Sequence, residues 1–374
     1  MSFSPNLVTR FSHLLRPLFR QRPPPRNPQR VILIKPCCLG DVVQATATVA
    51  ALKHRYPQAR LDFAVGGWSR PVLDNNPHIT HLIDTGRVGQ GRYTVVDLFT
   101  LARQLRRQRY DLAVTLARSP VVGLVPWLAG IPHRIGLDSF GRGFAHTIRV
   151  PVSEAPKHEA EIYLACAMAA GLKEADHQFW TEFYPAQTDQ DALHLLNGNP
   201  FVVIHPAGGV NPGMQMLDKR WPPERFAALA DRLAGCGFHI VLTGLADDAP
   251  LCRQVVGHMA NKTAQVLAGQ LTLGQFGALC RQAALFVGGD TGAMHIAVAC
   301  GCKTVAIFGP SDPRRYGPFA PAGKARTLWR AVSIPEGGVG QGQVQDFNWA
   351  QGVTVDEAWD ACQDLLVGRE EIGD

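Results

Sequence analysis

The sequence predicts an α/β protein built from two doubly wound, Rossmann-like domains. Short apolar runs typical of buried strands alternate with helical segments from Arg30 onward. The same alternation restarts at Phe201, after a polar stretch. The length of 374 residues fits two domains, since a domain typically has about 100–200 residues. Alternation of this kind produces parallel sheets with helices on both faces.

In the first half, each predicted strand is a short apolar run, and each predicted helix is a longer segment with apolar residues on one side. The predicted strands are Val31–Lys35, Leu61–Val65, Asp111–Leu116 and the strand end Arg134–Gly136. The predicted helices are Val42–Tyr56, Asp97–Arg109 and Glu159–Gly171.

The second half repeats this order of elements. Pro223 and Gly237 bracket one helix clearly, because proline is favoured in the first turn and glycine just after the last. The predicted strands are Phe201–His205, His239–Thr243, Leu285–Val287 and Thr304–Phe308. The predicted helices are Pro223–Cys236, Ala249–Ala260, Leu273–Gln282, Ala293–Cys300 and a last one, Thr354–Val367, whose partner domain the pattern does not decide.

The positive charge is concentrated at the N-terminus. The formal net charge is +6, and residues 1–30 contain six arginines with no lysine, aspartate or glutamate. The remaining residues are therefore formally neutral and show no basic stripe of the kind that nucleic-acid-binding domains carry. We expect no nucleic acid among the partners.

The N-terminal tail has two parts. Apolar residues recur every three or four positions from Phe3 to Phe19 with arginines between them, which predicts a basic amphipathic helix that Pro17 would kink. Residues 21–29 are rich in proline and arginine and predict an extended linker. Such a helix fits an anionic membrane surface, and a disordered or self-docked tail is the alternative.

The compartment is predicted to be cytoplasmic. No apolar run approaches the ~20 residues needed to span a bilayer, and no secretory signal is evident. The nine cysteines form no CxxC pair, which favours reduced thiols and no structural zinc site. With the basic tail, this predicts a cytoplasmic protein that is peripheral on the inner face of the plasma membrane.

The first chemically informative loop is Pro36–Asp41, between a predicted strand and a predicted helix. Gly40 permits a tight turn and Asp41 stands at or near the helix N-terminus, either as a catalytic carboxylate or as an ordinary cap. The loop has no GxGxxG pattern, which disfavours NAD binding. No GxxxxGK[ST] occurs in the chain, which argues against a phosphate-loop NTPase.

Two loops of the second half are candidate phosphate sites. Gly208 and Gly209 follow a strand and leave backbone N–H groups accessible to phosphates, with Lys219 adding positive charge further along. The turn Asp290-Thr291-Gly292 follows a strand and opens directly into a helix, whose first N–H groups attract anions. A solvated surface loop and a plain helix cap are the respective alternatives.

Taken together, these loops resemble one known family. The LGD turn that contains Asp41, the KRWP element that starts at Lys219, and the run GGDTGAMHIAVACGCKTVAIFGPSDPRRYGP that starts at Gly288 are similar to the motifs of glycosyltransferase family 9. Its best-known members are the ADP-heptose:lipopolysaccharide heptosyltransferases. The resemblance covers nearly all of residues 30–320, with the motifs in the same order.

The resemblance implies a GT-B fold, in which two Rossmann-like doubly wound domains face a cleft. It implies that the first Rossmann-like domain, predicted at 30–185, is the acceptor side, and that the second, predicted at 198–350, binds the nucleotide sugar. The basic tail at residues 1–29 is not part of the family core, and a C-terminal helix and tail are predicted at 351–374. The resemblance further implies inverting sugar transfer with no metal ion and no cofactor, the donor being a nucleotide diphosphate sugar, foremost ADP-heptose.

The roles of single residues also come from the resemblance. Asp41 matches the aspartate proposed as the general base, and Lys219 matches a lysine near the diphosphate. Asp290, Thr291 and Gly292 match the donor-phosphate turn, and His295 matches the histidine that follows it. With Gly208 and Gly209, predicted from the glycine loop itself, the donor-binding set is Gly208, Gly209, Lys219, Asp290, Thr291, Gly292 and His295.

The sequence thus favours a glycosyltransferase that moves a sugar, foremost heptose, to a lipopolysaccharide-core or other envelope glycan. Two alternatives stay open. The first is a sugar-nucleotide epimerase on the same scaffold, and the second is a non-catalytic nucleotide-sugar-binding protein.

Overall fold

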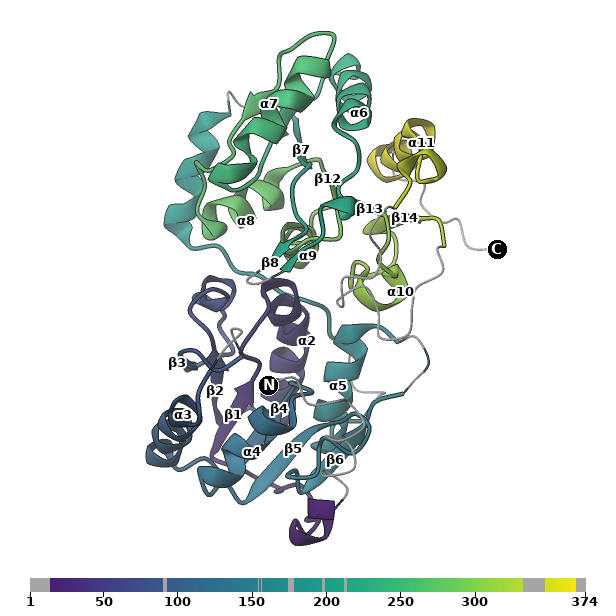
Figure 1. Cartoon of the computed structure of the whole chain (residues 1–374). Coiled ribbons are helices and arrows are strands. Elements are labelled where there is room, and N and C mark those ends of the chain that lie inside the picture. Colours follow the sequence, from purple (N-terminus) through teal and green to yellow (C-terminus); the bar gives the residue numbers. More distant parts are fainter. Residues whose placement is uncertain are drawn as a thin grey trace, which may run out of the picture. The chain divides into compact units, whose positions relative to one another are not determined.

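The chain forms two compact units, Met1–Trp180 and Thr181–Asp374. The computed structural model describes residues 14–89, 93–153, 155, 157–173, 178–196, 199–211, 214–331 and 347–367. Each unit contains one six-stranded sheet in which all strands are parallel, flanked by helices (Figure 1). The predicted α/β class with two Rossmann-like domains is confirmed.

The sheet of the first unit has the strand order β3-β2-β1-β4-β5-β6. Its strands are β1 (Arg30–Ile34), β2 (Arg60–Val65), β3 (His81–Asp84), β4 (Leu112–Thr115), β5 (His133–Asp138) and β6 (Ile148–Pro151). Its helices are α2 (Leu39–Arg55), α3 (Val95–Gln108), α4 (Pro120–Leu128) and α5 (Glu159–Ala169), with 3-10 turns η1 (Arg16–Leu18) and η2 (Arg70–Val72). Numbered within the unit, this is the Rossmann order 3-2-1-4-5-6.

The second unit repeats that order as β11-β10-β7-β12-β13-β14. Its strands are β7 (Phe201–His205), β10 (His239–Leu242), β11 (Gln265–Val266), β12 (Leu285–Gly289), β13 (Thr304–Phe308) and β14 (Ala325–Trp329), with a two-stranded hairpin of β8 (Val210–Asn211) and β9 (Met214–Gln215). Its helices are α6 (Pro223–Gly235), α7 (Ala249–His258), α8 (Leu273–Gln282), α9 (Gly292–Ala299), α10 (Pro313–Tyr316) and α11 (Val355–Val367). The 3-10 turns are η3 (Gln187–Leu195), η4 (Leu217–Lys219), η5 (Ala246–Asp248) and η7 (Trp349–Gln351).

Strand β1 and helix α2 form the buried centre of the first unit. In β1, Val31 to Ile34 are all buried, as expected for a parallel strand covered on both faces. In α2, every residue from Val42 to Leu52 is buried, and this helix packs against α5. The last helix, α11, packs on α6, β13 and β14, which places it in the second unit.

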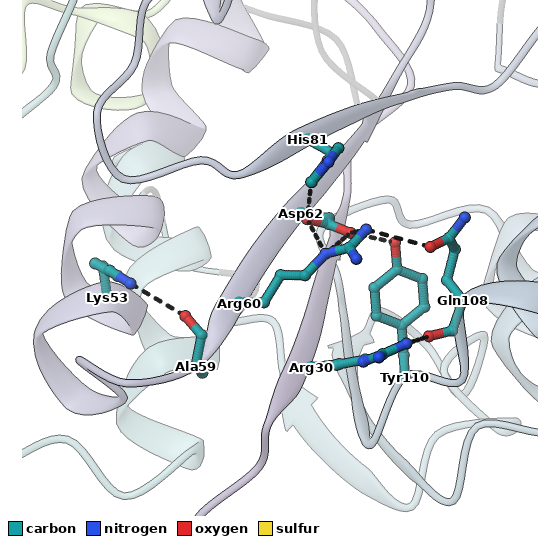
Figure 2. A network of polar contacts seen from close by, with 8 residues as sticks. All are labelled: Arg30, Lys53, Ala59, Arg60, Asp62, His81, Gln108 and Tyr110. Atoms are coloured by element: carbon teal, nitrogen blue, oxygen red, sulfur yellow. Dashed lines mark hydrogen bonds and ion pairs between the residues drawn. The ribbon is translucent and has the colours of Figure 1, made fainter.

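A polar network stabilises β2 of the first unit (Figure 2). Asp62 has no exposed side-chain area, yet its carboxylate accepts hydrogen bonds from Arg60 Nη2 at 2.7 Å and from Tyr110 Oη at 2.7 Å. Burial and the bond to Asp62 raise the pKa of Tyr110, so the phenol stays a donor. Since a buried carboxylate is tolerated only with such partners, the network is structural.

The N-terminal segment is docked on its own unit from Leu15 onward. Phe19 is buried against Phe144 and Trp127, with ring centroids 5.4 Å apart in both pairs. The backbone N–H of Arg22 donates to Thr147 O at 3.1 Å, and Arg16 forms an ion pair with Asp138 at 3.2 Å. The self-docked alternative therefore describes this part of the tail, while most of the predicted amphipathic helix lies outside the described residues. No helix in the described ranges is long and apolar enough to cross a membrane.

Candidate active site

The predicted site residues lie at the switch point of each sheet, where the strand order reverses. In the first unit this point lies between β1 and β4, and in the second between β7 and β12. Loops at the carboxyl ends of such neighbouring strands diverge and leave a crevice in which ligands of doubly wound folds bind. Asp41 follows β1, Gly208 and Gly209 follow β7, and Asp290 follows β12.

Asp41 is held by an ion pair and does not cap its helix. Helix α2 begins at Leu39, three residues earlier than predicted, so Asp41 lies in its first turn, and the N-cap residue Cys38 makes no side-chain capping bond. Asp41 Oδ2 lies 3.0 Å from Lys35 Nζ, and the Asp41 side chain is 29% exposed. The structure therefore favours a carboxylate that is held in place yet accessible.

Lys35 has a second support. It is the residue directly after β1, its side chain is only 10% exposed, and its Nζ lies 5.2 Å from the ring centroid of Tyr163 on α5. A cation over an aromatic face is stabilised by the ring quadrupole. Burial, followed by the charges of Asp41 and Glu159, raises the pKa of Tyr163 far above its ordinary value, so this ring stays neutral.

A second ion pair flanks the same switch point. Arg118, in the loop after β4, pairs with Glu159 at the start of α5 through two hydrogen bonds, of which Nη2–Oε2 measures 2.9 Å. Burial opposes the charge of Arg118, but Glu159 outweighs it and raises the pKa of the guanidinium. Arg118 is 25% exposed and Glu159 2%, so the glutamate fixes an arginine that presents positive charge at the crevice. The sequence reading missed both residues, although the position of Arg118 at a strand end was a usable signal.

Two thiols lie beside Asp41. Cys37 Sγ and Cys38 Sγ are 2.9 Å apart. The hydrogen bond with Cys38 lowers the pKa of Cys37 to about 7, with a further contribution from Lys35. Cys37 is thus the one thiol of the described residues whose pKa is shifted downward, since each of the other shifted thiols is shifted upward.

In the second unit, Lys219 and Asp290 form a nearly buried ion pair. Lys219 Nζ lies 2.5 Å from Asp290 Oδ2, with side chains 13% and 10% exposed. Burial acts to raise the pKa of Asp290, but Lys219, with smaller contributions from His295 and Ser311, brings it below its ordinary value. The sequence placed both residues at the site but not in contact with each other.

The KRWP element positions Lys219 through its tryptophan. Trp221 is 1% exposed, packs edge-on against Phe226 at 4.9 Å, and donates from Nε1 to Val353 O at 2.9 Å. Arg220 donates from Nε to Gly208 O at 2.8 Å and pairs with Asp248 at 3.1 Å. The tryptophan therefore anchors the loop in the core, and Arg220 connects it to the glycine turn.

Gly208 and Gly209 have backbone conformations that only glycine adopts readily. Their φ angles are +114° and +73°. A Cβ atom on Gly208 would lie 2.1 Å from Thr291 Cγ2, and one on Gly209 would lie 2.2 Å from Met216 O. The lack of a side chain on Gly208 thus lets the loop after β7 contact the turn after β12, and the lack of one on Gly209 lets the same loop contact the backbone of Met216.

Replacing Gly208 with alanine is expected to destabilise the second unit by roughly 1–3 kcal/mol, because the strained φ and the contact with Thr291 act together. The shift of the urea unfolding midpoint measures this. Gly235→Ala is the control, since a Cβ at that helical position meets nothing within 4 Å. A shift of equal size in both variants would contradict the packing argument.

The turn after β12 has the features of an anion site. Thr291 is the N-cap of α9, and its Oγ1 accepts a hydrogen bond from Met294 N at 3.2 Å. Gly292 is the first residue of the helix, so its N–H has no partner within the helix. His295 is buried, with 4% of its area exposed.

His205 at the end of β7 contacts Thr243 Oγ1 at 3.1 Å. Burial lowers the pKa of His205 to about 4, so this imidazole is neutral.

Comparisons with known proteins agree with these motifs. The family model described as "Glycosyltransferase family 9 (heptosyltransferase)" matches residues 98–332. The chain is 29% identical over 312 residues to lipopolysaccharide heptosyltransferase 2 of Escherichia coli K12, covering 80% of this chain and 87% of that protein. It is 26% identical over 296 residues to lipopolysaccharide heptosyltransferase 3 of the same organism, covering 75% and 82%.

Solved structures resemble the fold over most of its length. The family 9 glycosyl transferase from Veillonella parvula superposes with a TM-score of 0.77 at 22% identity, covering 91% of this chain and 97% of that one. ADP-heptose lps heptosyltransferase II of E. coli superposes with a TM-score of 0.71 at 25% identity, covering 90% and 98%.

Proposed function

The chain belongs to glycosyltransferase family 9, and we propose that it transfers a heptose from ADP-heptose to the lipopolysaccharide core. The family makes it a glycosyltransferase. One relative is named as a lipopolysaccharide heptosyltransferase, and one solved structure as an ADP-heptose lps heptosyltransferase. These names support that donor and that class of acceptor for this chain.

In the proposed reaction, an acceptor hydroxyl attacks the anomeric carbon of the heptose. Asp41 takes the proton of that hydroxyl, the new glycosidic bond forms, and the bond from the anomeric carbon to the diphosphate oxygen breaks. ADP leaves with its electrons, and its charge is met by Lys219 and the N–H groups after β7 and β12. Because a single displacement from the opposite face inverts the anomeric centre, we propose an inverting reaction.

The observation that carries the donor site is the convergence of three motifs at one switch point. Gly208 reaches van der Waals contact with Thr291, and Lys219 pairs with Asp290, so the glycine loop, the lysine and the helix N-terminus form one site. A flexible glycine loop, a cation and a helix N-terminus together are a combination that binds phosphates.

The proposed site needs no metal ion, because Lys219 and the backbone N–H groups supply the positive charge that a diphosphate leaving group requires. Activity is expected to persist in the presence of a chelator such as EDTA, compared with the same assay without it. Loss of activity that added divalent cation restores would overturn this part of the proposal.

The test of function uses the full chain with ADP-, UDP-, GDP- and dTDP-linked sugars. Calorimetry is expected to show one preferred donor, ADP-heptose, and mass spectrometry is expected to show a heptose added to lipopolysaccharide core that lacks it. Product anomeric configuration, read by NMR, tests inversion. Conversion of the nucleotide sugar without any acceptor would instead support the epimerase alternative, and binding without conversion would support a binding protein.

The proposed partners are this donor, the glycolipid acceptor and an anionic membrane surface contacted through residues 1–29. A glycolipid acceptor lies in a membrane, so we propose that the protein works at the cytoplasmic face of the plasma membrane. The six arginines of residues 1–30 support this, because anionic lipids attract such segments.

A further inference from the structure

A cavity of about 450 Å³ lies between the docked N-terminal segment and the residues around α4 and β5 in the first unit. Three arginines line it, Arg20, Arg22 and Arg134, and none of the described residues in its lining is acidic. The cavity shares no residue with the site around Asp41. It is formed within one unit, and nothing in the proposed reaction uses it.

Arg134 is the unusual group of this cavity. Only 8% of its area is exposed, and its guanidinium donates to carbonyl oxygens alone, from Nε to Ala145 O at 2.9 Å and from Nη1 to Ile131 O at 2.6 Å. Among the described residues, no carboxylate pairs with it. Burial, together with the charge of Arg22, lowers its pKa to about 10. Buried charges are normally compensated, so this cation lacks the counter-charge that an anion in the cavity would supply.

The position of Arg22 is set by the backbone. Its N–H donates to Thr147 O at 3.1 Å, while Thr147 Oγ1 accepts from Arg134 N at 2.8 Å. The backbones of the two arginines are thus joined through one threonine, and the charge of Arg22 lies close enough to Arg134 to lower its pKa. Arg20, two residues earlier and exposed, adds a third charge. Planar guanidinium groups gathered in this way suit the oxygens of a phosphate.

The rim of the cavity is apolar and exposed. Leu18 and Trp127 both line the cavity, with 75% and 48% of their areas exposed, and Leu14 in the same segment is 78% exposed. A free anion makes no favourable contact with exposed apolar side chains, whereas the acyl chains of a phospholipid pack against them. Tryptophan is also favoured at the boundary between headgroups and hydrocarbon.

We propose that this cavity binds the phosphate group of an anionic phospholipid, with Leu18 and Trp127 entering the headgroup region. This inference rests on the membrane-surface part of the proposed function and names its site. The N-terminal segment then forms one side of a defined lipid-binding cavity, in addition to carrying positive charge.

The test measures sedimentation of the full chain with vesicles of phosphatidylcholine containing about one-third phosphatidylglycerol. Arg20→Gln/Arg22→Gln is expected to lower the partition coefficient by about 10-fold or more. Arg103→Gln/Arg107→Gln is the matched control, because it removes the same charge from α3 of the same unit and is expected to stay within about twofold of wild type. Trp127→Ser tests the apolar rim without a change of charge, and is expected to weaken binding as well.

Equal losses in the two arginine pairs would overturn the proposal in favour of diffuse electrostatics, as would no vesicle binding by the wild type. Inorganic phosphate, titrated alone by calorimetry, distinguishes the two sources of the anion. Binding of phosphate that Arg20→Gln/Arg22→Gln abolishes, without vesicle binding, would assign the cavity to a soluble anion. The rate of sugar transfer to a detergent-dispersed acceptor is measured on the same variants and is expected to equal that of wild type. This measurement separates failure of the lipid site from failure of the proposed function.

Discussion

Replacing Asp41 with asparagine is expected to lower turnover by about 100-fold or more while donor affinity barely changes. The carboxamide keeps the shape of the side chain but cannot take a proton from the acceptor hydroxyl. Asp41 lies in the first unit beside Lys35, whereas the proposed donor site is built wholly from the second unit. Steady-state kinetics and donor titration on the same preparation measure the two quantities separately.

The matched control for this variant is Asp74→Asn. Asp74 also belongs to the first unit and also forms an ion pair, with Arg70 at 3.3 Å, but its side chain is 46% exposed and lies outside the candidate site. Loss of this ion pair should leave turnover within about twofold of the wild-type value, because exposed ion pairs contribute little to stability. If Asp41→Asn weakened donor binding as much as turnover, the role of general base would be refuted.

The fold was predictable wherever a strand or helix carries its own signal. The apolar runs of β1, β7, β12 and β13 were recognised because parallel strands that are buried on both faces read as uninterrupted hydrophobic segments. Edge strands such as β3 and β14 were missed, since partial exposure breaks that pattern. Helix α4 was missed because its two prolines and a glycine suggest a loop, although Ser119 caps it and Pro120 occupies a favoured first position.

The residues of the site were predictable from the sequence, but the contacts between them were not. Glycines and an aspartate at strand ends identify loops, and the doubly wound topology brings those loops together. Pairings over long sequence distances have no local signal, as with Arg118 and Glu159, which are 41 positions apart. Docking of the tail uses long-range contacts such as that of Phe19 with Phe144, which no periodicity shows.

Replacing Lys219 with alanine is expected to weaken donor binding by about 10-fold or more and to lower kcat/KM by roughly 10²–10³-fold. The ammonium group is the cation nearest Asp290 and the helix N-terminus of α9, where the diphosphate is proposed to lie. Charge that develops on the leaving group would then lack its main counter-charge. Lys324→Ala, which removes an exposed lysine of the same unit, is the control for donor titration and kinetics.

This prediction needs a second variant, because Lys219→Ala also leaves the Asp290 carboxylate nearly buried without its partner. Such a loss typically costs about 3 kcal/mol of unfolding free energy. Lys219→Ala/Asp290→Asn removes both charges, so it should recover most of that stability without recovering donor affinity. The pKa of Asp290 is lowered in the folded protein, so its stabilising contribution is complete above the ordinary aspartate range, near pH 4, and is lost as the pH falls through the lowered value. The stability difference between wild type and Asp290→Asn should therefore shrink in acid. Recovery of donor affinity in the double variant would show that Lys219 serves the fold alone, and the phosphate role would then pass to the backbone N–H groups of the glycine loop and α9.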